Sequence, residues 1–194
     1  MRETTNIEEK LIESFKELAL KEPVEKITIK EITDGAGVIR TTFYYHFQDK
    51  YELIERILQE NLVDPIMSVV REGRVDDAIL ELMRTLDAEK PFYRRLSKME
   101  GQNSFEEILT RDISAGLTDV IEHLSGGENK IALKGKYPWM TTKIISEYYA
   151  RAMTFALITF LNMEPPAPAE EAAEVFDYVL RHTLNETLVE WYLK

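Results

Sequence analysis

One short stretch gathers most of the side chains that could recognise another molecule. Residues 37–47, GVIRTTFYYHF, combine an arginine, two threonines, two tyrosines and a histidine with two phenylalanines. At about 100° per residue, Phe43 and Phe47 fall one turn apart on one face of a helix, while Thr41, Thr42 and Tyr45 point elsewhere. One face therefore anchors the helix and the other offers hydrogen-bond donors. This surface is suited to binding, because catalysis needs a nucleophile paired with a base, or a metal cluster.

The residues before this stretch predict a second helix beside it. A helix this short is not stable alone, so neighbouring elements must hold it. The run TIKE at residues 28–31 has the pattern of a capping box, in which the threonine and the glutamate exchange hydrogen bonds with each other's amides. It predicts a helix over residues 29–36, and Gly35 and Gly37 bracket a tight turn into the next helix. Together these features predict a helix-turn-helix whose second helix enters a DNA major groove.

Residues 7–58 resemble the DNA-binding domain of the tetracycline-repressor (TetR/AcrR) transcriptional regulators. The signature of that family is close to Ala-Gly-Val-Ser-x-x-Thr-aromatic-Tyr-x-His-Phe, followed by a short polar link and Lys, and residues 36–50 read AGVIRTTFYYHFQDK. Ile39 departs from it, because the family usually has a polar residue there that caps the recognition helix. Losing a cap costs about 0.5–2 kcal/mol, so the start of this helix is expected to depend on the packing of Ile39. Residues 43–51 are especially similar to regulators of the dihydroxyacetone-kinase type.

Position within the helix-turn-helix divides the polar side chains into two expected groups. The candidates for contact with base edges are Arg40, Thr41 and Tyr45, and the arginine could address guanine N7 and O6 in a bidentate way. The candidates for contact with phosphates are Thr28, Lys30, Thr42, Tyr44, His46 and Lys50. The resemblance implies a one-component transcriptional regulator, which we interpret as a repressor. It would bind a near-palindromic operator as a homodimer and be released by a small-molecule effector.

The charge of the chain limits how it can bind DNA. The net charge is −11, and residues 1–60 alone hold 9 Lys and Arg against 13 Asp and Glu, a net charge of −4. Non-specific affinity comes from neutralised phosphates, so this chain is not a generic nucleic-acid coat. Residues 37–48, however, contain Arg40 and no carboxylate. We therefore expect a small, locally basic or neutral reading surface on an acidic protein, with the affinity resting on two half-sites.

The rest of the pattern predicts an all-α protein of about nine helices. We expect a helix-turn-helix DNA-binding domain over residues 1–48, opened by a helix at about 7–21, and a helical effector-binding and dimerisation domain over residues 49–194. Asp49 can cap the fourth helix, with Glu52 at the capping-box position and with Pro65 and Gly73 limiting its length. Further helices are expected, the last two at about 139–162 and 170–193, with a loop at 126–138 before them. The absence of a leader and of a long apolar run leads us to expect a cytoplasmic protein.

The last two predicted helices are apolar around most of their circumference, which is expected of helices buried on two sides. The resemblance implies that they form a four-helix bundle with a second copy of the chain. The expected interface residues are Tyr149, Met153, Ala156, Phe160, Val175, Tyr178, Val179 and Trp191. The alternative is that these residues fill the core of a monomeric bundle.

Aromatic and methionine side chains in the second domain could line an apolar effector pocket between the fourth and eighth helices. The candidates are Met83, Phe92, Tyr93, Met99, Phe105, Trp139 and Tyr148, although residues of this kind more often form ordinary core.

The chemistry of an enzyme is not indicated. The chain has 3 histidines and no cysteine, no histidine has a second one at helical spacing, and no phosphate loop or nucleophile elbow is present. We expect no metal, no cofactor and no catalytic residue. A competing class is a TetR-like coactivator or adaptor that acts mainly through a protein partner, which the acidic head, the missing cap at Ile39 and the dihydroxyacetone-kinase likeness favour.

Overall fold

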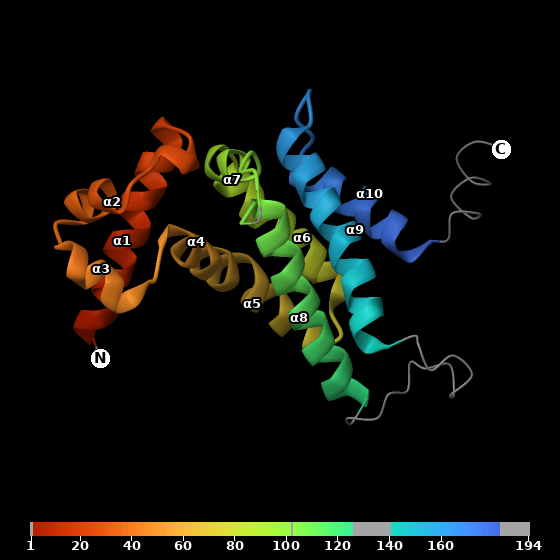
Figure 1. Cartoon of the computed structure of the whole chain (residues 1–194). Coiled ribbons are helices and arrows are strands. Elements are labelled where there is room, and N and C mark those ends of the chain that lie inside the picture. Colours follow the sequence, from red (N-terminus) through yellow and green to blue (C-terminus); the bar gives the residue numbers. More distant parts are fainter. Residues whose placement is uncertain (1, 102, 126–140, 183–194) are drawn as a thin grey trace.

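The structure is a computed structural model and describes residues 2–101, 103–125 and 141–182 of the 194-residue chain. Over these residues the chain forms ten α-helices, one 3₁₀ turn, one π-helical turn and no strand. Figure 1 shows the N-terminal helices forming a head on one side and a larger helical body on the other, with α4 (Lys50–Leu58) and α5 (Asp64–Arg71) running between them. The predicted all-α class, with a helix-turn-helix head and a helical body, is confirmed.

The head consists of α1 (Arg2–Lys21), the 3₁₀ turn η1 (Val24–Lys26), α2 (Ile29–Ala36) and α3 (Arg40–His46). The inner face of α1 is fully buried at Leu11, Phe15 and Ala19, and α1 packs along α2. Gly35 lies inside α2, where a Cβ would come within 2.2 Å of the Ser14 Oγ. The predicted turn role of Gly35 was therefore wrong: this glycine allows α1 and α2 to approach closely, and Gly37 alone makes the turn.

A continuous helical segment links the head to the body. It comprises α4 (Lys50–Leu58), the π turn η2 (Gln59–Val63) and α5 (Asp64–Arg71). The amide of Asp64 donates to the carbonyl of Gln59, five residues earlier. Pro65 has no N–H and its ring crowds the carbonyl four residues before it, so a wider turn accommodates it. We expected Pro65 to limit the fourth helix, but it lies in the first turn of α5, and the helical path ends near Gly73, which has a φ of 78°.

Asp49 caps α4 as predicted, because its carboxylate accepts hydrogen bonds from the amides of Tyr51 and Glu52. The Glu52 carboxylate reaches back one residue further than a capping box requires, and it accepts from the amide of Gln48 at 2.5 Å. Two carboxylates thus satisfy amides at this end, where the helix dipole favours negative charge.

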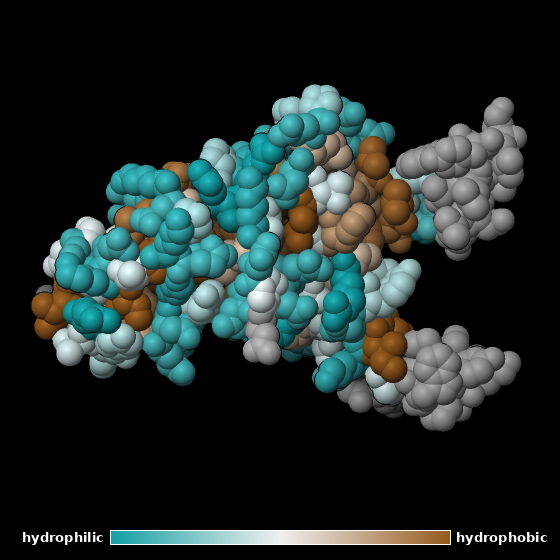
Figure 2. Space-filling model, turned by 45° about the horizontal axis from the view of Figure 1, so that its top comes forward, coloured by the Kyte–Doolittle hydropathy of each residue, from teal (hydrophilic) through white to brown (hydrophobic). Residues whose placement is uncertain are grey.

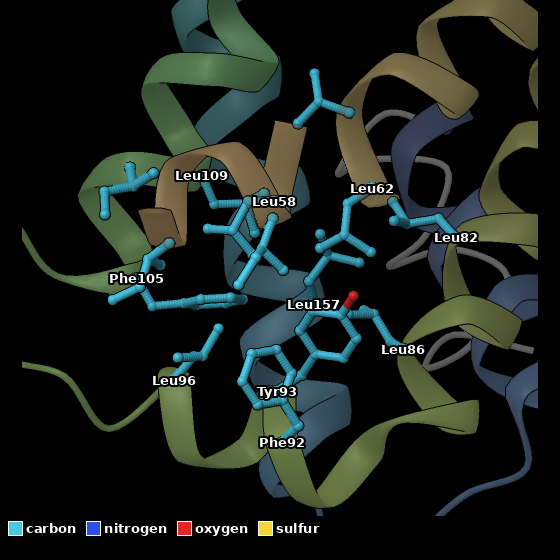
Figure 3. Packing of buried hydrophobic residues seen from close by; sticks show 14 of the residues in the cluster. Leu58, Leu62, Leu82, Leu86, Phe92, Tyr93, Leu96, Phe105, Leu109 and Leu157 are labelled. Atoms are coloured by element: carbon cyan, nitrogen blue, oxygen red, sulfur yellow. The ribbon is translucent and has the colours of Figure 1, made fainter. Parts of the chain in front are cut away.

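The body consists of α6 (Val75–Ala88), α7 (Lys90–Leu96), α8 (Phe105–Ser125), α9 (Thr142–Asn162) and α10 (Ala169–Arg181). Helix α8 runs along α9, and α6 packs against α10. Figure 3 shows the centre of the core, where side chains from η2, α6, α7, α8 and α9 meet. Burial of this many large apolar side chains supplies most of the driving force for folding.

The head touches the body at a second place besides α4. Phe15 of α1 meets Phe92 of α7 edge to face, with ring centroids 6.3 Å apart and an interplanar angle of 86°. Beside them, the Lys16 Nζ lies 2.6 Å from a carboxylate oxygen of Glu89 and 5.3 Å from the centroid of the Phe92 ring. The hydrophobic cores of head and body therefore form one continuous cluster.

Helix boundaries differ from the prediction mainly at the ends. Helix α1 begins at Arg2 rather than near residue 7, and α9 begins at Thr142, whose preceding residue Thr141 caps it through its side chain. The last helix was predicted to run from 170 to 193, but α10 ends at Arg181, because His182 is extended with a φ of −100° and a ψ of 144°. The predicted loop at 126–138 lies outside the described residues.

Candidate nucleic-acid interface

Helix α3 is positioned by the turn that precedes it. Gly37 adopts a left-handed conformation with a φ of 67°, which glycine reaches without strain, and the amide of Val38 donates to the carbonyl of Thr33 at 3.0 Å. Ile39 stands at the N-cap with a φ of −88° and a ψ of 156° and makes no capping hydrogen bond. Its side chain is 70% exposed. The expectation that packing of Ile39 holds the start of the helix was wrong, because the glycine turn and the buried phenylalanines hold it.

One face of α3 is buried and the other is open, as the spacing predicts. Phe43 is fully buried and Phe47 is 2% exposed, with their ring centroids 5.7 Å apart. On the open face, Tyr45 is 81% exposed and Tyr44 is 51% exposed. Arg40 is also exposed and forms no ion pair with a described residue. Its guanidinium therefore remains available for an external acceptor.

The two candidates on α2 already have partners within the helix. The Thr28 hydroxyl accepts from the Glu31 amide at 3.2 Å and lies 2.7 Å from the Glu31 carboxylate, which also accepts from the Thr28 amide at 2.8 Å. These hydrogen bonds lower the pKa of Glu31 from its ordinary value. The predicted capping box is confirmed. Lys30 lies 2.5 Å from Asp34, whose hydrogen bond and charge raise the lysine pKa, but its side chain is exposed and can exchange this partner.

His46 does not face outward. Its side chain is 4% exposed, and its Nδ1 lies 2.9 Å from a carboxylate oxygen of Glu8 on α1. The prediction that His46 contacts a phosphate was therefore wrong, because its imidazole is buried and connects the end of α3 to α1. Glu8, one of the acids that make the head negative, has this contact as its structural role.

Lys50 is also committed inside the head. Its Nζ donates to the backbone carbonyls of Val24, Glu25 and Ile27 at 2.8, 2.9 and 2.9 Å. An ammonium has three N–H donors, and all three are used. Burial lowers the pKa of Lys50, against the opposing charges of Glu25 and Asp49. The prediction that Lys50 contacts a phosphate was also wrong, because this lysine connects the start of α4 to the η1 turn.

The body contains an apolar cavity of about 260 Å³ where α5, α6, α8, α9 and α10 meet. Its wall includes Met67, Ile79, Leu82, Leu117 and Met153, and its polar edge is the Asp177–Arg181 pair, with the Arg181 Nε 2.6 Å from the Asp177 carboxylate. Within the described residues, this partly open apolar cavity could hold a small ligand.

The predicted pocket residues do not line this cavity. Buried in the solid core are Met83, Phe92, Tyr93, Met99 and Phe105. Tyr148 is 69% exposed, and Trp139 lies outside the described residues. Burial raises the pKa of the Tyr93 hydroxyl well above its ordinary value, while a hydrogen bond with Asn61 of η2 opposes the rise. Residue type identified apolar positions correctly but could not separate filled core from open space.

The predicted dimer residues divide between the core and the surface. Phe160 and Ala156 are buried within the protomer, which removes them from any interface, and Met153 and Tyr178 are half-buried. Exposed are Tyr149, Val175 and Val179, and Trp191 lies outside the described residues.

Three residues of α9 form an exposed apolar line. Ile144, Tyr148 and Phe155 are 45%, 69% and 73% exposed, and at about 100° per residue they fall within a narrow arc of the helix. Together with Val175 and Val179 they form what we call the α9–α10 face. Figure 2 shows hydrophobic surface at this end of the body, away from the head. Phe155 was not predicted for an interface.

Within the described residues, no helix is both long and apolar enough to cross a bilayer. Among the same residues, no group of three or more His, Asp and Glu side chains is arranged to hold a metal ion.

The head thus has the helix-turn-helix arrangement of a DNA-binding domain, and the outer face of α3 is open. Residues 11–57 match the family described as bacterial regulatory proteins, tetR family. This match assigns a tetR-family DNA-binding domain to residues 11–57, which run from α1 into α4 and include the helix-turn-helix.

Comparison with individual proteins agrees with this assignment. The HTH-type dhaKLM operon transcriptional activator DhaS of Lactococcus lactis subsp. lactis (strain IL1403) is 29% identical over 91 residues, which are 46% of this chain and 49% of that protein. The chain thus spans about half the length of this curated relative. The match agrees with the dihydroxyacetone-kinase likeness of the sequence.

Solved structures match over most of the chain and support the fold. The dihydroxyacetone kinase operon activator DhaS has a TM-score of 0.61 at 19% identity, covering 90% of this chain and 93% of that one. A putative TetR-family regulator from Syntrophomonas wolfei has a TM-score of 0.66 at 16% identity, with 97% of each chain covered. NalD, the secondary repressor of the MexAB-OprM multidrug efflux pump in Pseudomonas aeruginosa, has a TM-score of 0.57 at 19% identity, covering 89% and 95%.

Proposed function

We propose that this protein is a transcriptional regulator that inserts α3 into the major groove of an operator. The observation that carries the proposal is the open face of α3, with Arg40 unpaired among the described residues and Tyr45 81% exposed, on a helix anchored by Phe43 and Phe47. Arg40 and Thr41 begin the helix, where residues of a recognition helix meet base edges. Tyr45 extends the same reading face.

Phosphate contacts in this proposal come from fewer groups than the sequence suggested. Lys30, Thr42 and Tyr44 remain, and Thr28 can add a contact through its exposed side, whereas His46 and Lys50 are committed to internal partners. Because so few cations face the DNA, the salt dependence of binding should be shallow for each head. Useful affinity then requires two heads on one site.

We further propose that the two heads are paired by a homodimer formed through the α9–α10 face. A two-fold axis makes such an interface isologous, so one apolar face on each copy is sufficient. Heads about 34–36 Å apart would meet two half-sites one helical turn apart. Sedimentation of the wild type as a dimer, and of Phe155→Glu as a monomer, is expected; Leu20→Glu, at a 47% exposed residue of α1, is the matched control. A dimeric Phe155→Glu variant would remove this face from the interface.

The effector of this proposal is a small, mostly apolar molecule in the 260 Å³ cavity. Met67 of α5 lines that cavity, and α5 continues into α4 through the π turn, so a ligand that alters α5 can tilt the head. Carrying a switch from 1:99 to 99:1 requires an affinity difference of about 10⁴-fold between the two head spacings. A compound that binds without changing operator affinity would exclude this mechanism for that compound.

The sign of regulation proposed here is repression, as the sequence suggested. The similar proteins include both signs, since NalD is named a repressor and DhaS an activator. A reporter gene placed behind the operator decides the matter: deleting the regulator should raise expression, and a fall would assign activation instead.

DNA binding is tested by a gel shift with the intergenic DNA beside the gene, at a stated salt concentration. Arg40→Ala should lose about 1–3 kcal/mol of binding free energy and relax the preference at one base pair. Arg56→Ala, which removes an exposed arginine on α4 that pairs with Glu60, is the control and should bind normally. A loss that is equal on all sequences would contradict base contact by Arg40.

A second candidate function is an adaptor that acts through a protein partner. It is favoured by the net charge of −4 over residues 1–60 and by Ile39, an apolar side chain 70% exposed at the tip of the head. Lack of any shift at about 50 mM salt by a dimeric, folded protein would support this candidate over DNA binding.

A further inference from the structure

A basic groove lies on the body between α7 and the segment that joins α9 to α10. One wall carries Lys90, Arg94, Arg95 and Lys98, and the other is formed by residues 163–166; the hollow between them is about 680 Å³. We call it the α7 groove. Figure 1 shows α7 and the α9–α10 connection at the same end of the body. In a chain with a net charge of −11, four cations around one hollow are a local reversal of charge.

The four cations differ in what already holds them. Lys90 lies 3.1 Å from Asp87 and 4.0 Å from the centroid of the Phe160 ring, which fixes it to the core. Arg95 and Lys98 form no ion pair with a residue that the structure describes. Cations near a helix C-terminus interact favourably with the helix dipole. This interaction accounts for the positive charge of Arg95 and Lys98 but not for the grouping of four cations around one hollow.

Arg94 is the group best placed to bind an anion. Its Nη2 lies 2.5 Å from a carboxylate oxygen of Glu164, while its Nε is enclosed and has no hydrogen-bond partner. A guanidinium binds an oxyanion most strongly through two parallel N–H groups, and Glu164 uses only one of this pair. The hydrogen bond from Arg94, and then the charges of Arg94 and Lys98, lower the pKa of Glu164. The Glu164 side chain is 73% exposed, so it can leave without losing buried contacts.

We propose that the α7 groove binds the phosphate of a small organic phosphate monoester, with Glu164 occupying the position that one phosphate oxygen takes. A phosphate carries about −1.5 to −2 charge near neutral pH and three acceptor oxygens, which suits Arg94 with Arg95 and Lys98 better than a carboxylate does. The apolar residues Leu161, Pro165 and Pro166 line the same hollow and would contact the organic part. The size of the hollow is that of a small-molecule site, within the usual range of about 300–1,000 Å³.

The chain contains a matched pair of residues for the experiment. Arg84 and Glu170 form a similar exposed ion pair, with the Arg84 Nε 2.9 Å from the Glu170 carboxylate, outside the α7 groove. Arg94→Gln and Arg84→Gln lower the net charge by the same amount, and Glu164→Gln and Glu170→Gln raise it by the same amount. General electrostatic attraction is therefore separated from binding in the groove.

Calorimetric titration with inorganic phosphate and with phenyl phosphate, at constant ionic strength and without DNA, tests the proposal. Wild type should bind both saturably, phenyl phosphate more tightly. Arg94→Gln should weaken binding by about tenfold or more, because a charge-assisted hydrogen bond is lost, while Arg84→Gln should not. Glu164→Gln should tighten binding, because it removes the internal competitor, whereas Glu170→Gln should have no effect.

Three results would overturn the proposal: no saturable binding by wild type, equal losses for Arg94→Gln and Arg84→Gln, or equal affinities for Glu164→Gln and Glu170→Gln. If Arg94→Gln does not fold, as judged by its far-ultraviolet circular dichroism, the double variant Arg95→Gln/Lys98→Gln takes its place and should show the same loss. Because no DNA is present, either outcome leaves the proposed operator binding to be tested separately.

Discussion

Replacing Lys50 distinguishes a structural role of this side chain in the head from a contact with DNA. We consider its replacement by methionine, which keeps a similar aliphatic length but removes the ammonium. The substitution leaves the carbonyls of Val24, Glu25 and Ile27 without their shared donor. It therefore detaches the start of α4 from the η1 turn, and the head should lose stability even in the absence of DNA.

The expected loss follows from the three hydrogen bonds. A hydrogen bond to a charged group contributes about 1.5–3 kcal/mol net, but the carbonyls lie near the surface and water can replace part of the interaction. We expect a total loss of about 2–4 kcal/mol, which is a large part of the usual 5–15 kcal/mol of domain stability. With a urea slope of about 1–3 kcal/mol/M, the unfolding midpoint should fall by roughly 1–2 M.

Urea unfolding followed by circular dichroism measures this shift, and operator binding at several salt concentrations completes the comparison. Lys30→Met, which removes an exposed lysine of the same head, is the control and should leave the midpoint near that of wild type. The reasoning is refuted if Lys50→Met keeps the wild-type midpoint while the slope of log K against log salt falls by about one, since that is the signature of a phosphate contact.

Three other substitutions test separate features of the structure. Gly35→Ala should destabilise the head by about 1–3 kcal/mol, because its Cβ would lie 2.2 Å from the Ser14 Oγ, and additional Ser14→Ala should recover part of the loss in urea unfolding; strictly additive losses would contradict this. Ile39→Ser should raise the free energy of unfolding by about 0.5–2 kcal/mol, because it supplies the missing cap, and the urea midpoint should rise with it; a lower midpoint would mean that Ile39 packs. Burial raises the pKa of Asp112 from 3.8 to about 6, so the folded state holds this proton more tightly than the unfolded state, and its contribution to stability, up to about 3 kcal/mol, is lost as pH rises from about 4 to about 6. Asp112→Asn should remove that pH dependence, as measured by urea midpoints at about pH 4 and about pH 7, and an unchanged pH profile would disprove the assignment.

Local features of the head could be predicted because their determinants lie close together in the sequence. The capping box at Thr28 and Glu31, the span of α2 and the anchoring by Phe43 and Phe47 each depend on residues within one or two turns. The roles of Lys50 and His46 could not be predicted in this way. Their partners lie 23–26 and 38 residues earlier, and only the packed head brings them together.

The candidate pocket and interface were harder to predict for a different reason. Periodicity identifies which residues are apolar, but an apolar residue can fill the core, line a cavity or face solvent. Phe160 and Phe155 both lie on α9, five residues apart, yet one is fully buried and the other is 73% exposed. The packing of α9 against its neighbours decides the difference, and that packing is set by the rest of the fold.

The contact between Phe15 and Phe92 limits how the head can move. A head attached only through α4 could rotate in any direction relative to the body. The head is attached at both α4 and α7. Rotation about the line through these two contacts is therefore its easiest motion. A displacement within the body would therefore reach α3 as a rotation about that line.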